Sequence, residues 1–127
     1  MMRALLSLTL AGCTAAGPLE DKASETALAR ELGDRVAGAS EECVSQGQAR
    51  ALRVVDARTL VYHRGDAIWV NRLEHECPGL RPISTLVVES VGGRYCRNDR
   101  IRAVEPGTTI PGPTCLLGDF TPYRRPG

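Results

Sequence analysis

Hydrophobic and polar residues follow two different periods along this chain. Between residues 21 and 38, Leu28, Leu32 and Val36 recur at the spacing of one face of an α-helix. Acidic residues fill the start of this segment, and Gly38 is a stop signal at its end. The pattern predicts a helix over residues 21–38. Its apolar stripe is thin, so we expect a surface helix that is only partly docked on the domain.

From residue 43 onward the pattern changes to short runs of β-branched and apolar residues, separated by turn signals. These runs occupy residues 51–55, 59–63, 67–73, 83–91, 94–96, 101–105 and 115–120. Gly92-Gly93 is expected to form a tight turn between two of them. Five to seven short strands in about 80 residues predict a mainly β fold, a small antiparallel barrel or rolled sheet preceded by the one N-terminal helix. We place this β domain at residues 39–123 and a short tail at residues 124–127.

The clearest hairpin is expected between residues 59 and 73. Gly65 and Asp66 separate two apolar runs there, which is the signature of a two-residue turn. Such a turn places Tyr62 opposite Trp69, and aromatic pairs of this kind stabilise antiparallel strands. His63 then lies on the other face of the strand pair, among apolar residues.

The first 12 residues have the layout of a short bacterial export signal. Arg3 precedes a run of about eight mostly apolar residues, which is too short to span a bilayer. The run ends in Leu10-Ala11-Gly12-Cys13, which resembles the lipobox of bacterial lipoproteins. The resemblance implies a diacylglycerol on the Cys13 sulfur and cleavage before that residue. Residues 1–12 are therefore predicted to be a signal peptide, and residues 13–20 a lipidated tether.

A lipoprotein of this kind is anchored in the bacterial cell envelope and faces the periplasm. In Gram-negative bacteria an Asp after the lipidated cysteine typically retains the protein in the inner membrane. Thr14 occupies that position here, which favours the outer membrane. Two alternatives stay open: an ordinary secreted signal cleaved near Ala15-Ala16, giving a soluble periplasmic protein, and a cytoplasmic protein with a hydrophobic start.

Composition and net charge indicate a single folded domain and argue against a nucleic-acid binder. The chain has 127 residues, of which 43% are hydrophobic and 24% charged, as in an ordinary single folded domain. Its net charge of +1 argues against a dedicated nucleic-acid binder. A basic concentration is formed by Arg94, Arg97, Arg100, Arg102, Arg124 and Arg125. These arginines suggest an anionic envelope component as partner, although solvated strand faces are the favoured interpretation.

Four cysteines remain when Cys13 is set aside. An even number in an exported domain indicates two structural disulfides, and four cysteines allow three connectivities. We favour Cys77–Cys96, because these residues bracket one strand and its turn. The second bridge is then Cys43–Cys115, because the ends of compact domains often lie close together.

Other uses of the polar residues are weaker hypotheses. His63, His75 and Cys77 are types that bind zinc, but they lack any standard ligand spacing. Asp56 and Asp99 are candidates for a catalytic carboxylate pair, yet each lies at a predicted turn, where Asp is favoured for backbone bonding. We therefore predict no catalytic residue, no metal and no cofactor, and expect that the chain is not an enzyme.

Several motifs together resemble those of a known family. In chain order they are Cys43-Val44, Val54-Val55-Asp56, Trp69-Val70-Asn71-Arg72-Leu73, Cys77-Pro78-Gly79-Leu80, Tyr95-Cys96, Asp99-Arg100-Ile101 and Cys115-Leu116-Leu117-Gly118-Asp119-Phe120. Over residues 35–122 the chain resembles domain-of-unknown-function family 6491, small exported proteins of Proteobacteria that are often lipoproteins. The resemblance implies export and a cysteine-stapled domain. It implies no activity and no catalytic residue, because the family has none assigned.

Two classes of function follow. The first is a non-enzymatic envelope lipoprotein, a small binding or interaction module at the periplasmic face of the membrane. Its partner would be an unknown envelope protein or an anionic envelope component, and not a nucleic acid. The second is a small periplasmic enzyme or enzyme inhibitor, which a cleft around His63 or Asp99 would favour.

Overall fold

One helix and ten short strands make up the part of the chain that the computed structural model describes, residues 17–47 and 51–127. The helix is α1 (Gly17–Leu32). The strands are β1 (Val36–Ala37), β2 (Cys43–Ser45), β3 (Arg53–Asp56), β4 (Thr59–Arg64), β5 (Ala67–Arg72), β6 (Thr85–Glu89), β7 (Arg94–Cys96), β8 (Arg100–Val104), β9 (Cys115–Leu116) and β10 (Phe120–Arg124). The mainly β character is therefore confirmed.

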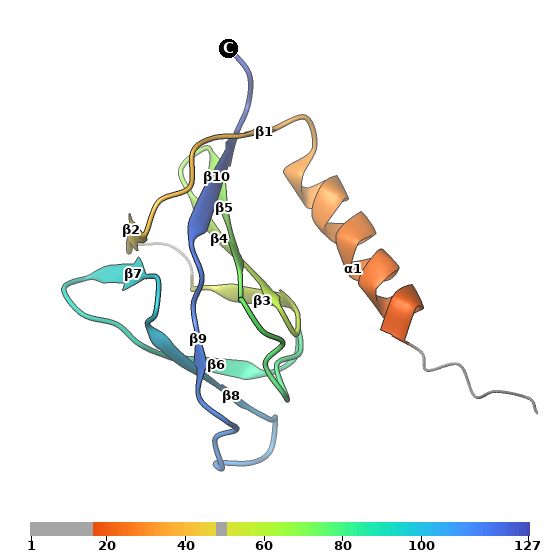
Figure 1. Cartoon of the computed structure of the whole chain (residues 1–127), viewed down its shortest axis with the longest axis vertical. Helices are drawn as coiled ribbons and strands as arrows, with labels where there is room; N and C mark the ends of the chain where they lie inside the picture. Colours follow the sequence, from red (N-terminus) through yellow and green to blue (C-terminus); the bar gives the residue numbers. More distant parts are fainter. Residues whose placement is uncertain (1–16, 48–50) are drawn as a thin grey trace, which may run out of the picture.

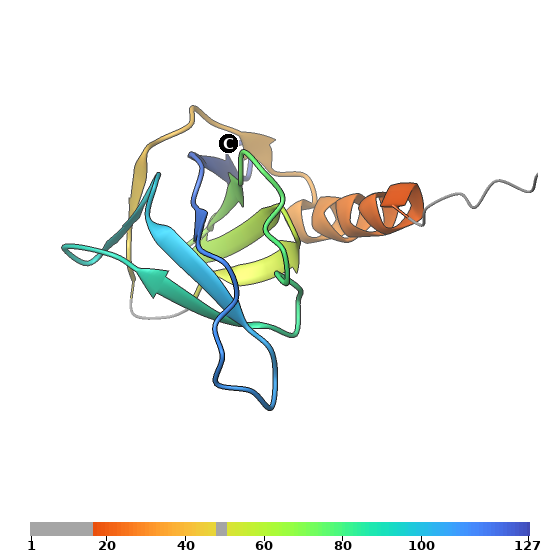
Figure 2. The ribbon, with the colours of Figure 1, turned by 60° about the horizontal axis from the view of Figure 1, so that its bottom comes forward.

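The strands form three antiparallel sheets around a shared core (Figures 1 and 2). The largest has the order β1-β10-β5-β4-β3, a second has the order β6-β8-β9, and β2 pairs with β7. Among the described strands no barrel closes, and they outnumber the five to seven that were expected. The two strands on either side of Gly92-Gly93 do not pair with each other as a hairpin. The turn forms, but only the isolated bridge between Val91 and Arg94 flanks it. β6 pairs instead with β8, and β7 pairs with β2.

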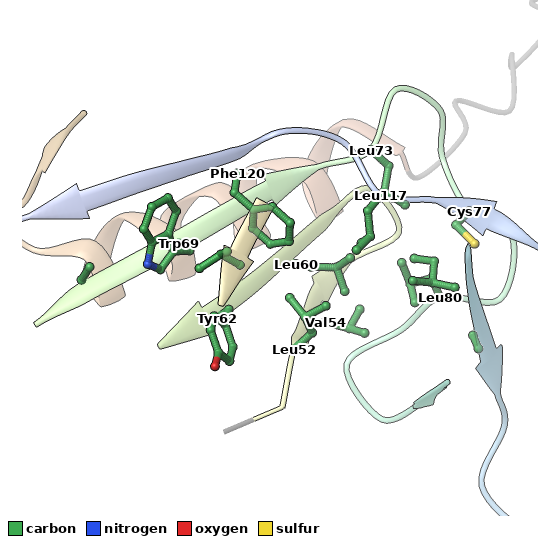
Figure 3. Packing of buried hydrophobic residues seen from close by; sticks show 14 residues of the cluster. Leu52, Val54, Leu60, Tyr62, Trp69, Leu73, Cys77, Leu80, Leu117 and Phe120 are labelled. Atoms are coloured by element: carbon green, nitrogen blue, oxygen red, sulfur yellow. The ribbon is translucent and has the colours of Figure 1, made fainter. Parts of the chain in front are cut away.

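The hairpin of β4 and β5 has the predicted register. Tyr62 lies opposite Trp69, and Gly65 takes a φ of 58° in the turn. Tyr62 and Trp69 point into the main core, where Leu60 and Phe120 join them (Figure 3). Val61, Ile68 and Val70 point to the opposite face of the sheet, because side chains alternate along a strand.

The helix begins and ends earlier in the sequence than predicted. It ends at Leu32, because Gly33 adopts a left-handed φ of 61° and its N–H still bonds to the Ala29 carbonyl. The predicted helical span of residues 21–38 is therefore wrong at both ends. Val36 and Ala37 form β1, and part of the predicted tether of residues 13–20 is already helical from Gly17.

The helix packs on the outer face of the five-stranded sheet, over β4 and β5 (Figure 1). Leu28 is buried there against Val61, Ile68 and Val70, and Leu32 packs partly against the same cluster. The thin stripe of the sequence is therefore enough to bury one face of β4 and β5. The helix buries this face through very few side chains of its own.

The C-terminal segment is part of the large sheet. β10 pairs with β5 on one side and β1 on the other, so Arg124 belongs to a strand and not to the predicted tail of residues 124–127. Pro122 is buried within this strand. Its carbonyl accepts a hydrogen bond from Gly38 N–H at 2.7 Å, on the side of β1. The Pro122 nitrogen, which has no hydrogen to donate, faces the same side, just beyond the end of β1. The ladder to β5 is therefore left intact.

Candidate functional site

Two disulfides staple the smaller sheets. The bonds are Cys43–Cys96 and Cys77–Cys115, so the prediction of two structural disulfides is confirmed and the favoured pairing is wrong. Cys43 and Cys96 lie directly opposite each other in the ladder of β2 and β7, with their Cα atoms 4.0 Å apart. The error arose because nothing in the local sequence indicates that β7 pairs with β2.

The second disulfide frames a cleft. Cys77 lies in the loop after β5 and is buried, and its bond to Cys115 ties this loop to β9. The cleft beside it has a volume of about 480 Å³, which is within the usual range for small-molecule sites. Three segments line it: residues 72–78, residues 97–98 and residues 113–119. Because Cys77 is bonded to another cysteine, it is not available as the zinc ligand considered above.

The cleft presents charges of both signs. Arg97 lies 3.6 Å from Asp119, and Arg72 lies 3.0 Å from Glu25 of the helix. These side chains are about half exposed, and exposed ion pairs are weak, so their charged groups stay accessible to a ligand. His75 is exposed on the loop, as predicted, and also lines the cleft. Together these groups offer hydrogen-bond donors and acceptors beside an apolar wall.

Asn71 holds one wall of the cleft in place. This side chain is fully buried, and its Nδ2 donates to the Gly118 carbonyl at 2.7 Å, while Gly118 N–H donates to Asn71 Oδ1 at 2.8 Å. A Cβ on Gly118 would lie only 2.1 Å from the Arg72 carbonyl oxygen, so only glycine fits there. The sequence analysis missed this role. The available signal was a single amide inside an apolar strand.

His63 lies outside the cleft, in an ionic cluster under the helix. Its Nε2 is 2.6 Å from Glu31 Oε1, and Arg53 also bonds to the Glu31 carboxylate. Partial burial acts to raise the pKa of Glu31. The hydrogen bonds and charges of Arg53 and His63 outweigh burial and lower this pKa below its ordinary value of 4.5. The geometry makes His63 a partner that docks the helix.

Asp56 and Asp99 serve separate turns. Asp56 Oδ1 accepts the Arg58 N–H at 2.8 Å, and Asp99 Oδ2 accepts the Cys96 N–H at 2.8 Å. The interpretation of both residues as turn formers is confirmed. They do not form a carboxylate pair, because one lies at the end of β3 and the other before β8.

The predicted basic concentration is divided over several elements. Arg97 pairs with Asp119, Arg100 approaches Glu89 at 4.0 Å, and Arg102 Nε donates to Thr114 at 2.9 Å. Arg124 lies over the Trp69 ring, 5.4 Å from its centroid. Four of the six arginines therefore have partners within the domain.

Within residues 17–47 and 51–127, no group of three or more His, Cys, Asp or Glu side chains is close enough to hold a metal ion. The helix in that part of the chain is neither long nor apolar enough to cross a membrane. The predicted signal peptide of residues 1–12 and the lipidation site Cys13 lie outside the described residues.

Comparison with known protein families, with curated proteins and with solved structures finds no match to this chain.

Proposed function

We propose that this chain is an exported, lipid-anchored module of the bacterial cell envelope that binds a partner through the cleft at the Cys77–Cys115 disulfide. Cys13 is the lipidation site in this proposal, and the domain faces the periplasm from the outer membrane. The module has no enzymatic activity of its own. Membership of family 6491 stays a prediction, because the comparison with known families finds no match.

The Cys77–Cys115 disulfide is the observation that carries the proposal. Structural disulfides form and persist in oxidising compartments such as the periplasm, which supports export. The same bond joins two of the segments that line the cleft. A covalently braced concave site with mixed charges suits binding, since its geometry is established before a partner arrives.

The enzyme alternative receives less support. The cleft is lined by neither His63 nor Asp99, and both side chains are engaged in structural hydrogen bonds. His75 does line the cleft, but no Ser or Cys nucleophile stands beside it there, because Cys115 is in a disulfide.

Metabolic labelling tests the anchor. A bacterium that expresses the full chain with labelled palmitate should yield labelled protein in the membrane fraction, and Cys13→Ala should abolish the label. Cys43→Ala with Cys96→Ala serves as the control for cysteine replacement and should keep the label. Persistent labelling of Cys13→Ala would refute lipidation at this residue.

Site-specific photocrosslinking in living cells tests the cleft. A photoreactive amino acid at position 75 should capture a discrete partner, whereas the same group at the exposed Thr109, outside the cleft, should not. Arg97→Ala removes a cleft charge and should reduce the capture, while Arg94→Ala, an exposed arginine outside the cleft, should not. Equal capture from positions 75 and 109 would contradict the proposed site.

A further inference from the structure

β6 is the longest edge strand in the described part of the chain. β6 spans five residues, Thr85–Glu89, and pairs with β8 along its whole length. The three-stranded sheet ends at β6, so on its other side no described strand follows. The main-chain N–H and C=O groups of such an edge are a template for pairing with another strand.

Other sheet edges carry features that discourage pairing. β3 contains a register shift between Val54 and Asp56, and its Arg53 is bound to Glu31. β1 and β9 have only two residues each. β6 has a regular register and contains neither proline nor lysine. Of these edges, β6 is therefore the best suited to accept a strand.

Burial falls off toward this edge. Ile101 and Ala103 on β8 point inward and are buried. Leu86 and Val88 are in register with them on β6 and also point inward, yet both stay partly exposed. Within residues 17–47 and 51–127, the core therefore lacks full cover on the far side of β6, and a further strand there would supply it.

We propose that β6 is a homodimerisation edge, at which a second copy of this chain adds its own β6 in antiparallel register with Val87 on the twofold axis. In this register Leu86 faces Val88 of the second copy, so the two inner faces continue across the dimer. Thr85 faces Glu89, so the carboxylates stay apart and each has a hydroxyl opposite. The result is one continuous sheet of six strands.

Exposed apolar residues at both ends of β6 fit the same arrangement. Ile83 is 66% exposed and precedes the strand, and Val91 is 84% exposed and follows it. Because the strands run in opposite directions, Ile83 of one copy approaches Val91 of the other. The turn between β6 and β7 projects from the molecule, which leaves it accessible (Figure 2). Two five-residue strands bury less area than a standard interface, so we expect a weak dimer.

Charged substitutions of Val87, the residue on the twofold axis, test the proposal. Val87 is 46% exposed, so a polar residue there should be compatible with folding. Val87→Lys and Val87→Glu each place like charges opposite each other and should weaken self-association of the full chain about tenfold. Mixing the two variants pairs opposite charges and should restore dimers as heterodimers. Sedimentation measures the self-association, and native mass spectrometry identifies the heterodimers.

Leu116→Lys is the matched control. Leu116 is 50% exposed on β9, at the opposite edge of the same sheet, so its replacement should leave the dimer unchanged. A wild-type chain that stays monomeric at its highest soluble concentration would overturn the proposal. The same conclusion would follow from failure of the mixed variants to form heterodimers, or from a loss with Leu116→Lys equal to that with Val87→Lys. Leu116 also lines the cleft, so the measurements use purified protein without a cleft partner, and no outcome then depends on the anchor or on the occupant of the cleft.

Discussion

In the five-stranded sheet, β4 and β5 bury nearly every residue, whereas in the three-stranded sheet β6 and β8 alternate between inner and solvent-facing positions. The difference comes from α1, which covers the outer face of the first sheet. The second sheet has a single covered face. The disulfides follow this division, since one lies within the pair β2–β7 and the other reaches β9. The large sheet is held by its core on two faces, and the smaller sheets are held partly by covalent bonds.

The largest expected effect concerns the core of the large sheet. Phe120 is fully buried on β10, and Phe120→Ala should lower the free energy of unfolding by roughly 3–5 kcal/mol, through lost apolar burial and a cavity. Val87→Ala, the matched truncation on the open face of the three-stranded sheet, should change it by less than about 0.5 kcal/mol. Urea unfolding measures both. Equal losses would show that the two sheets do not differ as described.

Removal of the Cys77–Cys115 bridge should come next. Cys77→Ala with Cys115→Ala should cost about 2–4 kcal/mol, because the unfolded chain loses a crosslink. The loss of local stability should also differ between the two sheets. Amide exchange should speed up in β8 and β9 and stay slow in β4 and β5. Uniform acceleration across all four strands would indicate that the sheets open as one unit.

Asn71→Ala tests the junction between the two regions. Gly118 lies between β9 and β10, and this change leaves its N–H and carbonyl without the Asn71 side chain. We expect a loss of about 1–3 kcal/mol in unfolding free energy, as for other buried groups left unpaired. Gln46→Ala removes the exposed side-chain hydrogen bond to Ser90 and should cost far less. A similar loss for both variants would argue against a special role for Asn71.

The smallest effect is expected at the helix. Glu31→Gln should cost less than about 1 kcal/mol at neutral pH, because the carboxylate is partly exposed. Folding lowers the pKa of Glu31, so the stabilisation is complete above its ordinary pKa of 4.5 and is lost as the pH falls through the lower folded-state value. The difference between Glu31→Gln and wild type should therefore vanish in acid. Thermal unfolding at several pH values measures it, and a difference that persists in acid would contradict the assignment.

The sequence by itself determined the features that depend on neighbouring residues. The hairpin register at Tyr62 and Trp69 followed from a two-residue turn and strand alternation. The turn roles of Asp56 and Asp99 followed from the short reach of an aspartate side chain. The helix boundary was misplaced because two glycines were available as stops, and the structure uses Gly33.

Only the tertiary structure decided which distant segments meet. The pairing of β2 with β7 selects the Cys43–Cys96 bond. The pairing of β10 with both β5 and β1 places Arg124, predicted to belong to the tail, in an interior strand. The cleft likewise joins three segments that are separate in the chain. The sequence of a strand does not indicate which other strand it pairs with. Its alternation of apolar and polar residues is the same whichever strand it joins. The choice among partners depends on the packing of the whole core.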